Sequence, residues 1–209
     1  MKIIVWWLCA ALWVFACTPA PKADCRGADL SHYSFGAVDL SGIDLRGATL
    51  FRTYFNGTNL SGADLSGAVL RLARIVDGNL QGANLSGAVM HNIDLISTDL
   101  SGANLSKADL LRGEFLVSDF SGANLSGARL DRTVMRTVNL TEANLSGATL
   151  WWAVIDQAAL RNADLSGASF RWAEITRTNL QSAVLKNTEL PGATLRPGNV
   201  RPIPFDGMR

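Results

Sequence analysis

The sequence has few of the side chains that bind metals or transfer protons near neutral pH, with only two His and three Cys among 209 residues. A metal centre needs several such ligands close together, so this composition argues against one. An excess of charge of one sign is also missing, because 19 Lys and Arg face 18 Asp and Glu. That balance argues against general nucleic-acid binding, which needs a basic footprint, and against an acidic mimic of DNA. Apolar residues make up 48%, enough for an ordered core.

The chain also has no apolar run of the roughly 20 residues that a membrane-spanning helix needs. Its longest run, IIVWWLCAALWVFA, covers residues 3–16 and follows the positive Lys2. A positive start, a short apolar run and small residues at its end are typical of a secretory signal peptide. We therefore expect residues 1–16 to be a signal peptide and the protein to be exported.

The end of this run, Val14-Phe15-Ala16-Cys17, resembles the lipobox of bacterial lipoproteins, in which the Cys is lipid-modified. The resemblance implies that Cys17 is the lipid attachment site. Residues 17–22 contain two prolines and would form a short, extended tether. Val14 and Ala16 also suit ordinary signal peptidase, so plain secretion and an uncleaved anchor remain alternatives.

Large apolar residues recur at every fifth position from Leu30 to Leu195 without a change of phase. A smaller residue stands two positions before each, as in Ala63-Asp64-Leu65-Ser66-Gly67. A period of five suits neither an α-helix, around which the column would spiral, nor a continuous strand, on which it would alternate between faces. We infer that each pentapeptide forms one short side that ends in a turn, with every large residue pointing inward.

A longer period of four pentapeptides is visible in a decapeptide that starts with Asn or Asp and continues through two repeats. It begins at Asn59, Asn79, Asp99, Asp119 and Asn139. Tandem A-(D/N)-L-x-x units of this kind resemble the pentapeptide-repeat proteins. The resemblance implies an all-β fold, a right-handed quadrilateral parallel β-helix with four pentapeptides in each 20-residue coil. Residues 23–197 would then form a solenoid of about 8.5 coils, and the proline-rich residues 198–209 a C-terminal cap or tail.

The residues around each large one vary in ways that bear on packing. Asn or Asp often precedes it and can bond to the turn backbone. The small inner position is occupied by larger residues in several repeats, which we also expect to point inward. They are Tyr33, Val38, Ile43, Ile93 and Val138.

Catalysis needs side chains that converge in a concave site, and the unbroken phase leaves no inserted loop to build one. His91 falls at an outward position without an evident partner, which favours a solvated side chain. Cys25 falls at an inward position, where a small apolar filler is favoured over a redox or cross-linking role. We therefore expect no catalytic residue, no cofactor and no metal, and hence a protein that is not an enzyme.

One set of outward pairs differs from the Ser-Gly pairs elsewhere. The pairs that follow Leu50, Leu70 and their equivalents stack from coil to coil into a stripe, which we expect to be an interaction surface for a protein, a glycan or lipid headgroups near the anchor. Exposed Trp together with Arg is typical of an interaction hot spot, although scattered surface variation would give the same pattern. The residues expected in this surface are Trp151, Trp152, Trp172, Arg112, Arg132 and Arg171.

The sequence therefore favours an exported, non-catalytic scaffold or interaction module of the bacterial envelope. The expected partners are an envelope protein or glycan, the membrane through the lipid anchor, and a second copy in an end-to-end homodimer, but not nucleic acid. The resemblance also implies an alternative, since some relatives mimic duplex DNA and protect topoisomerases from inhibitors. The export signal and the neutral charge balance depart from that group.

Overall fold

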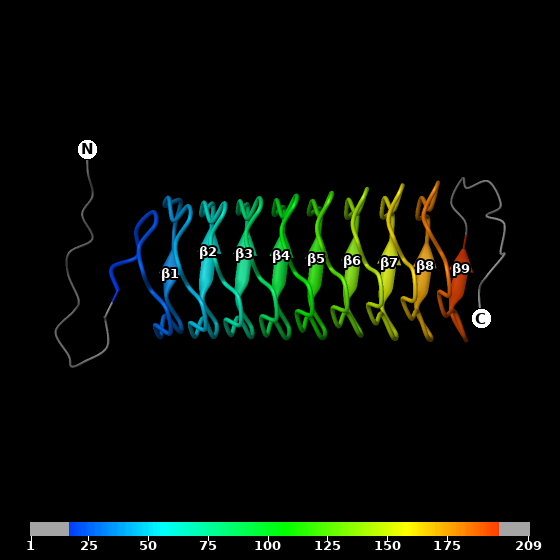
Figure 1. Ribbon diagram of the computed structural model, residues 1–209, viewed down its shortest axis with the longest axis horizontal. Coiled ribbons are helices and arrows are strands. Elements are labelled where there is room, and N and C mark those ends of the chain that lie inside the picture. Colours follow the sequence, from blue (N-terminus) through cyan, green and yellow to red (C-terminus); the bar gives the residue numbers. More distant parts are fainter. Residues whose placement is uncertain (1–16, 197–209) are drawn as a thin grey trace.

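The computed structural model describes residues 17–196, with side chains up to residue 194, so the expected signal peptide and the expected cap at 198–209 lie outside the described residues. The described chain winds into a straight rod along which nine short strands lie side by side (Figure 1). Within residues 17–196, no helix is long and apolar enough to cross a membrane.

One side of every coil is a β-strand of two or three residues, and the nine strands form a single parallel sheet in the order β1 to β9. Each strand pairs with the strand of the next coil, so that Phe55 lies opposite Ile75. The strands are β1 (Ser34–Phe35), β2 (Tyr54–Asn56), β3 (Arg74–Val76), β4 (Asp94–Ile96), β5 (Glu114–Leu116), β6 (Val134–Arg136), β7 (Val154–Asp156), β8 (Glu174–Thr176) and β9 (Thr194–Arg196).

The other three sides of each coil are joined to the next coil by single parallel bridges, such as the one between Asp44 and Asp64. On that side the Leu45 N–H donates to the Asp64 carbonyl oxygen at 2.7 Å, and the pattern repeats at Leu65. The backbone polar groups are thus satisfied by stacking, as expected of a solenoid. The parallel β-helix that the sequence predicted, with four pentapeptides in each coil, is confirmed.

The interior consists of the large residues at five-residue spacing, which are almost completely buried from Leu30 to Ile175. Ile43, Ile93 and Val138 are buried as predicted. The same prediction is wrong for two residues, Tyr33 and Val38, whose side chains are 45% and 42% exposed. Both lie in the first complete coil, which has a complete neighbouring coil on one side only among the described residues.

Threonine and serine occupy several of the small inner positions, and the hydroxyl at each of these positions has a carbonyl partner. Thr98 Oγ1, for example, donates to the Ile75 carbonyl oxygen of the preceding coil at 3.1 Å. Burial of a hydroxyl is tolerated when it is hydrogen-bonded in this way. The residues concerned are Thr53, Thr58, Thr98, Ser118, Thr133, Thr178 and Thr188.

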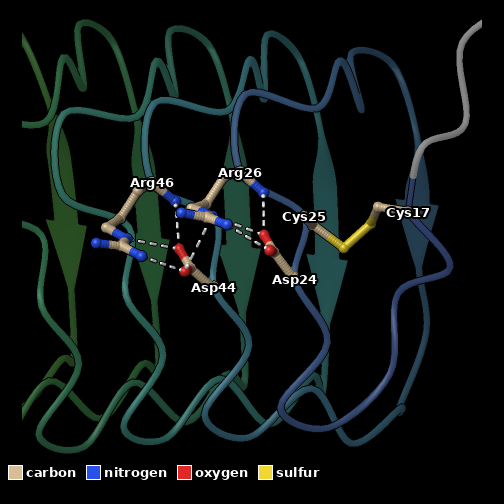
Figure 2. Close-up of a disulfide and its surroundings, with 6 residues drawn as sticks. All are labelled: Cys17, Asp24, Cys25, Arg26, Asp44 and Arg46. Atoms are coloured by element: carbon tan, nitrogen blue, oxygen red, sulfur yellow. Dashed lines mark hydrogen bonds and ion pairs between the residues drawn. A yellow bond between two sulfur atoms is a disulfide. The ribbon is translucent and has the colours of Figure 1, made fainter.

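The N-terminal segment expected to be an extended tether is packed against the first coil. The Lys22 N–H donates to the Ser41 carbonyl oxygen at 2.9 Å, in the same manner as the turn residues of later coils. Cys17 is buried and forms a disulfide with Cys25, with the two Cα atoms 4.9 Å apart (Figure 2). Cys25 does point inward, but the expectation of a simple apolar filler is wrong. Its sulfur links the solenoid to Cys17, in the segment that precedes the first repeat.

Candidate interaction surface

The corners of the solenoid are two-residue turns whose second residue has a positive φ. Glycine adopts this conformation without a steric penalty, and most second residues on the two Ser-Gly corners are glycine. On the corner that leads into the strands, the second residue is never glycine from His32 to Trp172. A left-handed conformation costs an ordinary residue roughly 1–2 kcal/mol, so the non-glycine residues at this corner adopt it at a local backbone cost, as do those from Asp77 to Arg177 on the corner that follows the strands.

We call this corner the Arg/Trp ridge and define it by the seven residue pairs 51–52, 71–72, 91–92, 111–112, 131–132, 151–152 and 171–172. In each pair the second residue is exposed, and the first is exposed or half-buried. All six residues that the sequence predicted for the interaction surface lie on this ridge. From Arg52 to Trp172 it crosses six coil steps, which is roughly 29 Å at about 4.8 Å per step.

At one end of the Arg/Trp ridge, two tryptophans have different roles. Trp152 is 49% exposed and has the Arg132 guanidinium over its ring, with the Arg Cζ 5.4 Å from the ring centroid. Trp151 is half-buried, and its Nε1–H donates to Ser169 Oγ at 2.9 Å. The Trp151 backbone N–H donates to Asp131 Oδ1 at 3.0 Å. Trp151 is thus fixed by hydrogen bonds, while Trp152 projects outward.

Trp172 is the most exposed aromatic side chain of the ridge, at 59%. Its ring lies over Gly192, where a Cβ would overlap the ring and where φ is +70°. Glycine at residue 192 leaves the space that the ring occupies, and it adopts the positive φ without the strain that other residues bear at this corner. The neighbouring Arg171 lies 3.8 Å from Glu189 Oε2 through its Nε, and its Cζ is 5.7 Å from the Trp151 ring.

The arginines of the Arg/Trp ridge are mostly without acidic partners. Among side chains up to residue 194, five arginines form no ion pair with a described residue, and four of them lie on the ridge. The ridge pairs contain five arginines and one aspartate, a net charge of +4. The four arginines without an ion pair are Arg52, Arg71, Arg112 and Arg132.

The adjoining strand side shows the opposite arrangement, since its charges pair with one another. Arg74 lies 3.9 Å from Asp94, and Arg136 lies 3.8 Å from Glu114. Partial burial and the neighbouring Glu114 carboxylate raise the pKa of Asp94 above its usual value. The positive charge of this part of the molecule is therefore concentrated on the Arg/Trp ridge.

A polar pair that the sequence did not predict lies in the middle of the ridge. His91 Nε2 is 2.7 Å from Asp109 Oδ2, and Arg129 Nε is 3.1 Å from Asp109 Oδ1. The expectation that His91 is solvated and without a partner is wrong. His91 and Asp109 lie far apart in the sequence and meet only because four pentapeptides complete one coil. The coil period could therefore have indicated that these two residues are neighbours.

Figure 2 shows a second charged ladder at the N-terminal end, where Arg26 lies between Asp24 and Asp44. Arg26 donates to both carboxylate oxygens of Asp24, at 2.9 and 2.7 Å. These hydrogen bonds lower the pKa of Asp24 to about 2. Both arginines of this ladder form ion pairs with aspartates, so the ladder stabilises the coil surface and leaves no arginine available for a partner.

Within the described chain, no group of three or more His, Cys, Asp or Glu side chains could hold a metal ion. A small void of about 10 Å³ lies in the apolar interior, between Phe115, Phe120 and Met135 among others. That is about the size of a single water molecule, and the residues around it are entirely apolar. The ridge is convex, and its exposed side chains project away from the rod.

Four-sided coils built from five-residue units define the molecule as a parallel β-helical repeat protein. The family model described as pentapeptide repeats matches it in 8 copies, and the chain therefore belongs to the pentapeptide repeat family. The matched residues are 23–67, 50–92, 73–110, 118–154, 143–181 and 153–190.

Two solved structures resemble the chain along most of its length. HetL from the cyanobacterium Nostoc sp. strain PCC 7120, described as involved in heterocyst differentiation regulation, is 32% identical over 83% of each chain, with a TM-score of 0.47. The fluoroquinolone resistance protein QnrB1 is 19% identical over 86% of this chain and 89% of its own, with a TM-score of 0.55, and shows the shared fold alone. No curated protein matches the sequence.

Proposed function

We propose that the protein is a non-catalytic scaffold or interaction module of the bacterial envelope, and that the Arg/Trp ridge makes its contacts. The observation that carries the proposal is the contrast between corners. Two corners present mainly Ser and Gly, whereas the ridge presents exposed Trp and unpaired Arg in one straight line. Trp and Arg are the residues that most often dominate binding energy in protein interfaces.

Capture of partners from an envelope fraction tests this proposal. Replacing Trp151, Trp152 and Trp172 by Ser should reduce the partners recovered with the purified protein. A matched control changes Ser66, Ser86 and Ser126 to Ala on a Ser-Gly corner, where recovery should be unchanged. Equal recovery with both triple variants would show that the ridge is not the contact surface.

Export and attachment are a second part of the proposal, supported by the signal-like residues 1–16 and by Cys17. A lipid thioether uses the same sulfur that forms the Cys17–Cys25 disulfide, so one molecule cannot carry both. Fatty-acid labelling separates the two states. If Cys17 is lipidated, Cys17→Ser loses the label and Cys25→Ser retains it. A wild-type protein without label, and with neither thiol reactive before reduction, would instead establish the disulfide form.

End-to-end pairing of two copies remains a prediction, supported by the last described coil, in which Leu180, Leu185 and Leu190 are partly exposed. Sedimentation of the purified protein would show a dimer. The topoisomerase-related alternative has no specific observation in its favour, because the described surface has no extended acidic face of the kind that mimics DNA.

A further inference from the structure

We infer that the Arg/Trp ridge binds an anionic phospholipid surface, along which the rod lies lengthwise. This inference rests on the proposal that the ridge is the interaction surface, and it names the partner. Its starting point is shape. The ridge is a straight, convex corner of roughly 29 Å at about 4.8 Å per coil step, so it offers a line of contact rather than a pocket. Small-molecule sites are concave, whereas a flat membrane surface can touch a convex line at every coil.

Charge supports the same partner. Arg52, Arg71, Arg112 and Arg132 make no ion pair with a described residue, although arginines elsewhere on the rod mostly do. A guanidinium matches the geometry of a phosphate oxygen pair. Arginines held in one row by the coil period can therefore meet a row of phosphate headgroups together.

The apolar residues of the ridge fit the boundary between headgroups and acyl chains. Trp152 and Trp172 are 49% and 59% exposed, and Leu72 is exposed on the same line. Tryptophan is enriched at membrane interfaces because its ring is apolar while its N–H is polar. Trp151 Nε1 is already bonded to Ser169, so Trp152 and Trp172, the more exposed rings of the ridge, are the ones that would contact the membrane.

The rigidity of the solenoid determines how the contacts of the ridge residues combine in the binding free energy. Every ridge pair follows directly from a buried residue of the core, and the coils hydrogen-bond to one another on all four sides. The ridge is therefore ordered before it binds, and its individually weak contacts share one loss of rotational freedom. A lipid-anchored or N-terminally attached rod would be held near the surface that the ridge recognises.

Vesicle flotation of the full chain tests this inference. Vesicles of phosphatidylcholine alone measure the contribution of apolar residues, both those of the segment 3–16 and the exposed tryptophans of the ridge, and the charge variants retain all of them. Adding phosphatidylglycerol should increase binding, and raising the salt concentration should reverse that increase. In the variant Arg52→Gln/Arg112→Gln/Arg132→Gln, the affinity for vesicles that contain phosphatidylglycerol should fall on the order of 100-fold. A matched control, Lys107→Gln/Arg161→Gln/Lys186→Gln, removes three charges from other corners and should keep it.

Three results would overturn the inference. They are equal binding to both kinds of vesicle, an equal loss in both charge variants, or no loss in the ridge variant. Trp152→Ser/Trp172→Ser should reduce the binding that survives high salt, and unchanged binding there would remove the tryptophans from the account. The variants change exposed residues, so an unchanged thermal melt confirms that they fold. If vesicles do not bind but the tryptophan variant loses a captured protein, the interaction module stands and its lipid partner is wrong.

Discussion

Inserting one glycine between Ser106 and Lys107 tests the register on which the whole solenoid depends. If all later residues followed the shift, Asn124 would take the inward position of Leu125, and most large inner residues of the later coils would be replaced by polar ones. Each buried side chain lost in this way costs about 1.5–3 kcal/mol. Over the remaining coils this is more than the usual net stability of about 5–15 kcal/mol. We therefore expect the extra residue to bulge outward at the corner.

The bulge disturbs two hydrogen bonds between coils, from the Gly87 N–H to the Ser106 oxygen and from the Lys107 N–H to the Ser126 oxygen, both 2.9 Å. Their loss should cost about 1–3 kcal/mol, which lowers the melting temperature by roughly 2–12 °C in a domain of this size. Circular dichroism melting measures the shift. Lys107→Gly is the matched control, because Lys107 has a φ of +57° that glycine adopts more easily, and its melting temperature should not fall.

An insertion variant that melts at the wild-type temperature would contradict the register argument. Complete unfolding would contradict the local bulge, since it would mean that the shift propagates through the later coils.

Three further predictions concern single features. Gly192→Ala should destabilise the protein by about 1–3 kcal/mol and alter Trp fluorescence, because the new Cβ overlaps the Trp172 ring; Gly67→Ala, with a similar φ of +65° but open space, should leave the fluorescence unchanged. Reducing the Cys17–Cys25 disulfide should lower stability by about 2.5 kcal/mol for its short loop, and reductant should have no effect on Cys25→Ser. Asp24 has a folded pKa of about 2 against 3.8 unperturbed, so its contribution is present above pH 3.8 and lost as the pH falls toward 2; an NMR titration of its carboxyl with a midpoint near 3.8 would contradict the pairing with Arg26.

The fold could be predicted from the sequence because one constraint repeats in every coil. A large apolar residue at each fifth position has only one arrangement in which Leu65, Leu85 and Leu105 all point inward. The recurrence of the decapeptide after every fourth pentapeptide then sets the number of sides. The prediction was wrong at Tyr33 and Val38, because the repeat describes an interior coil and these residues lie in the first complete one.

The candidate site was predicted in its residues but not in its interactions. Residues one coil period apart lie above one another, so the sequence alone predicted that Trp152 and Trp172 share one corner. The partners of the ridge residues come from the adjacent coil, as in His91 with Asp109 and Trp151 with Ser169. Which of these side chains meet depends on rotamers, and no repeat pattern specifies a rotamer. The Cys17–Cys25 disulfide was not predicted, because the sequence pattern indicated lipid attachment at Cys17 and an apolar packing role for Cys25.

Photo-crosslinking in the cell tests most directly whether the Arg/Trp ridge is the working surface. A photoreactive phenylalanine analogue replaces Trp152 on the ridge or Ser126 on a Ser-Gly corner, both exposed or half-buried turn positions. Light should produce adducts with lipid or protein from residue 152 and not from residue 126. Equal adducts from both positions, or none from residue 152, would contradict the account.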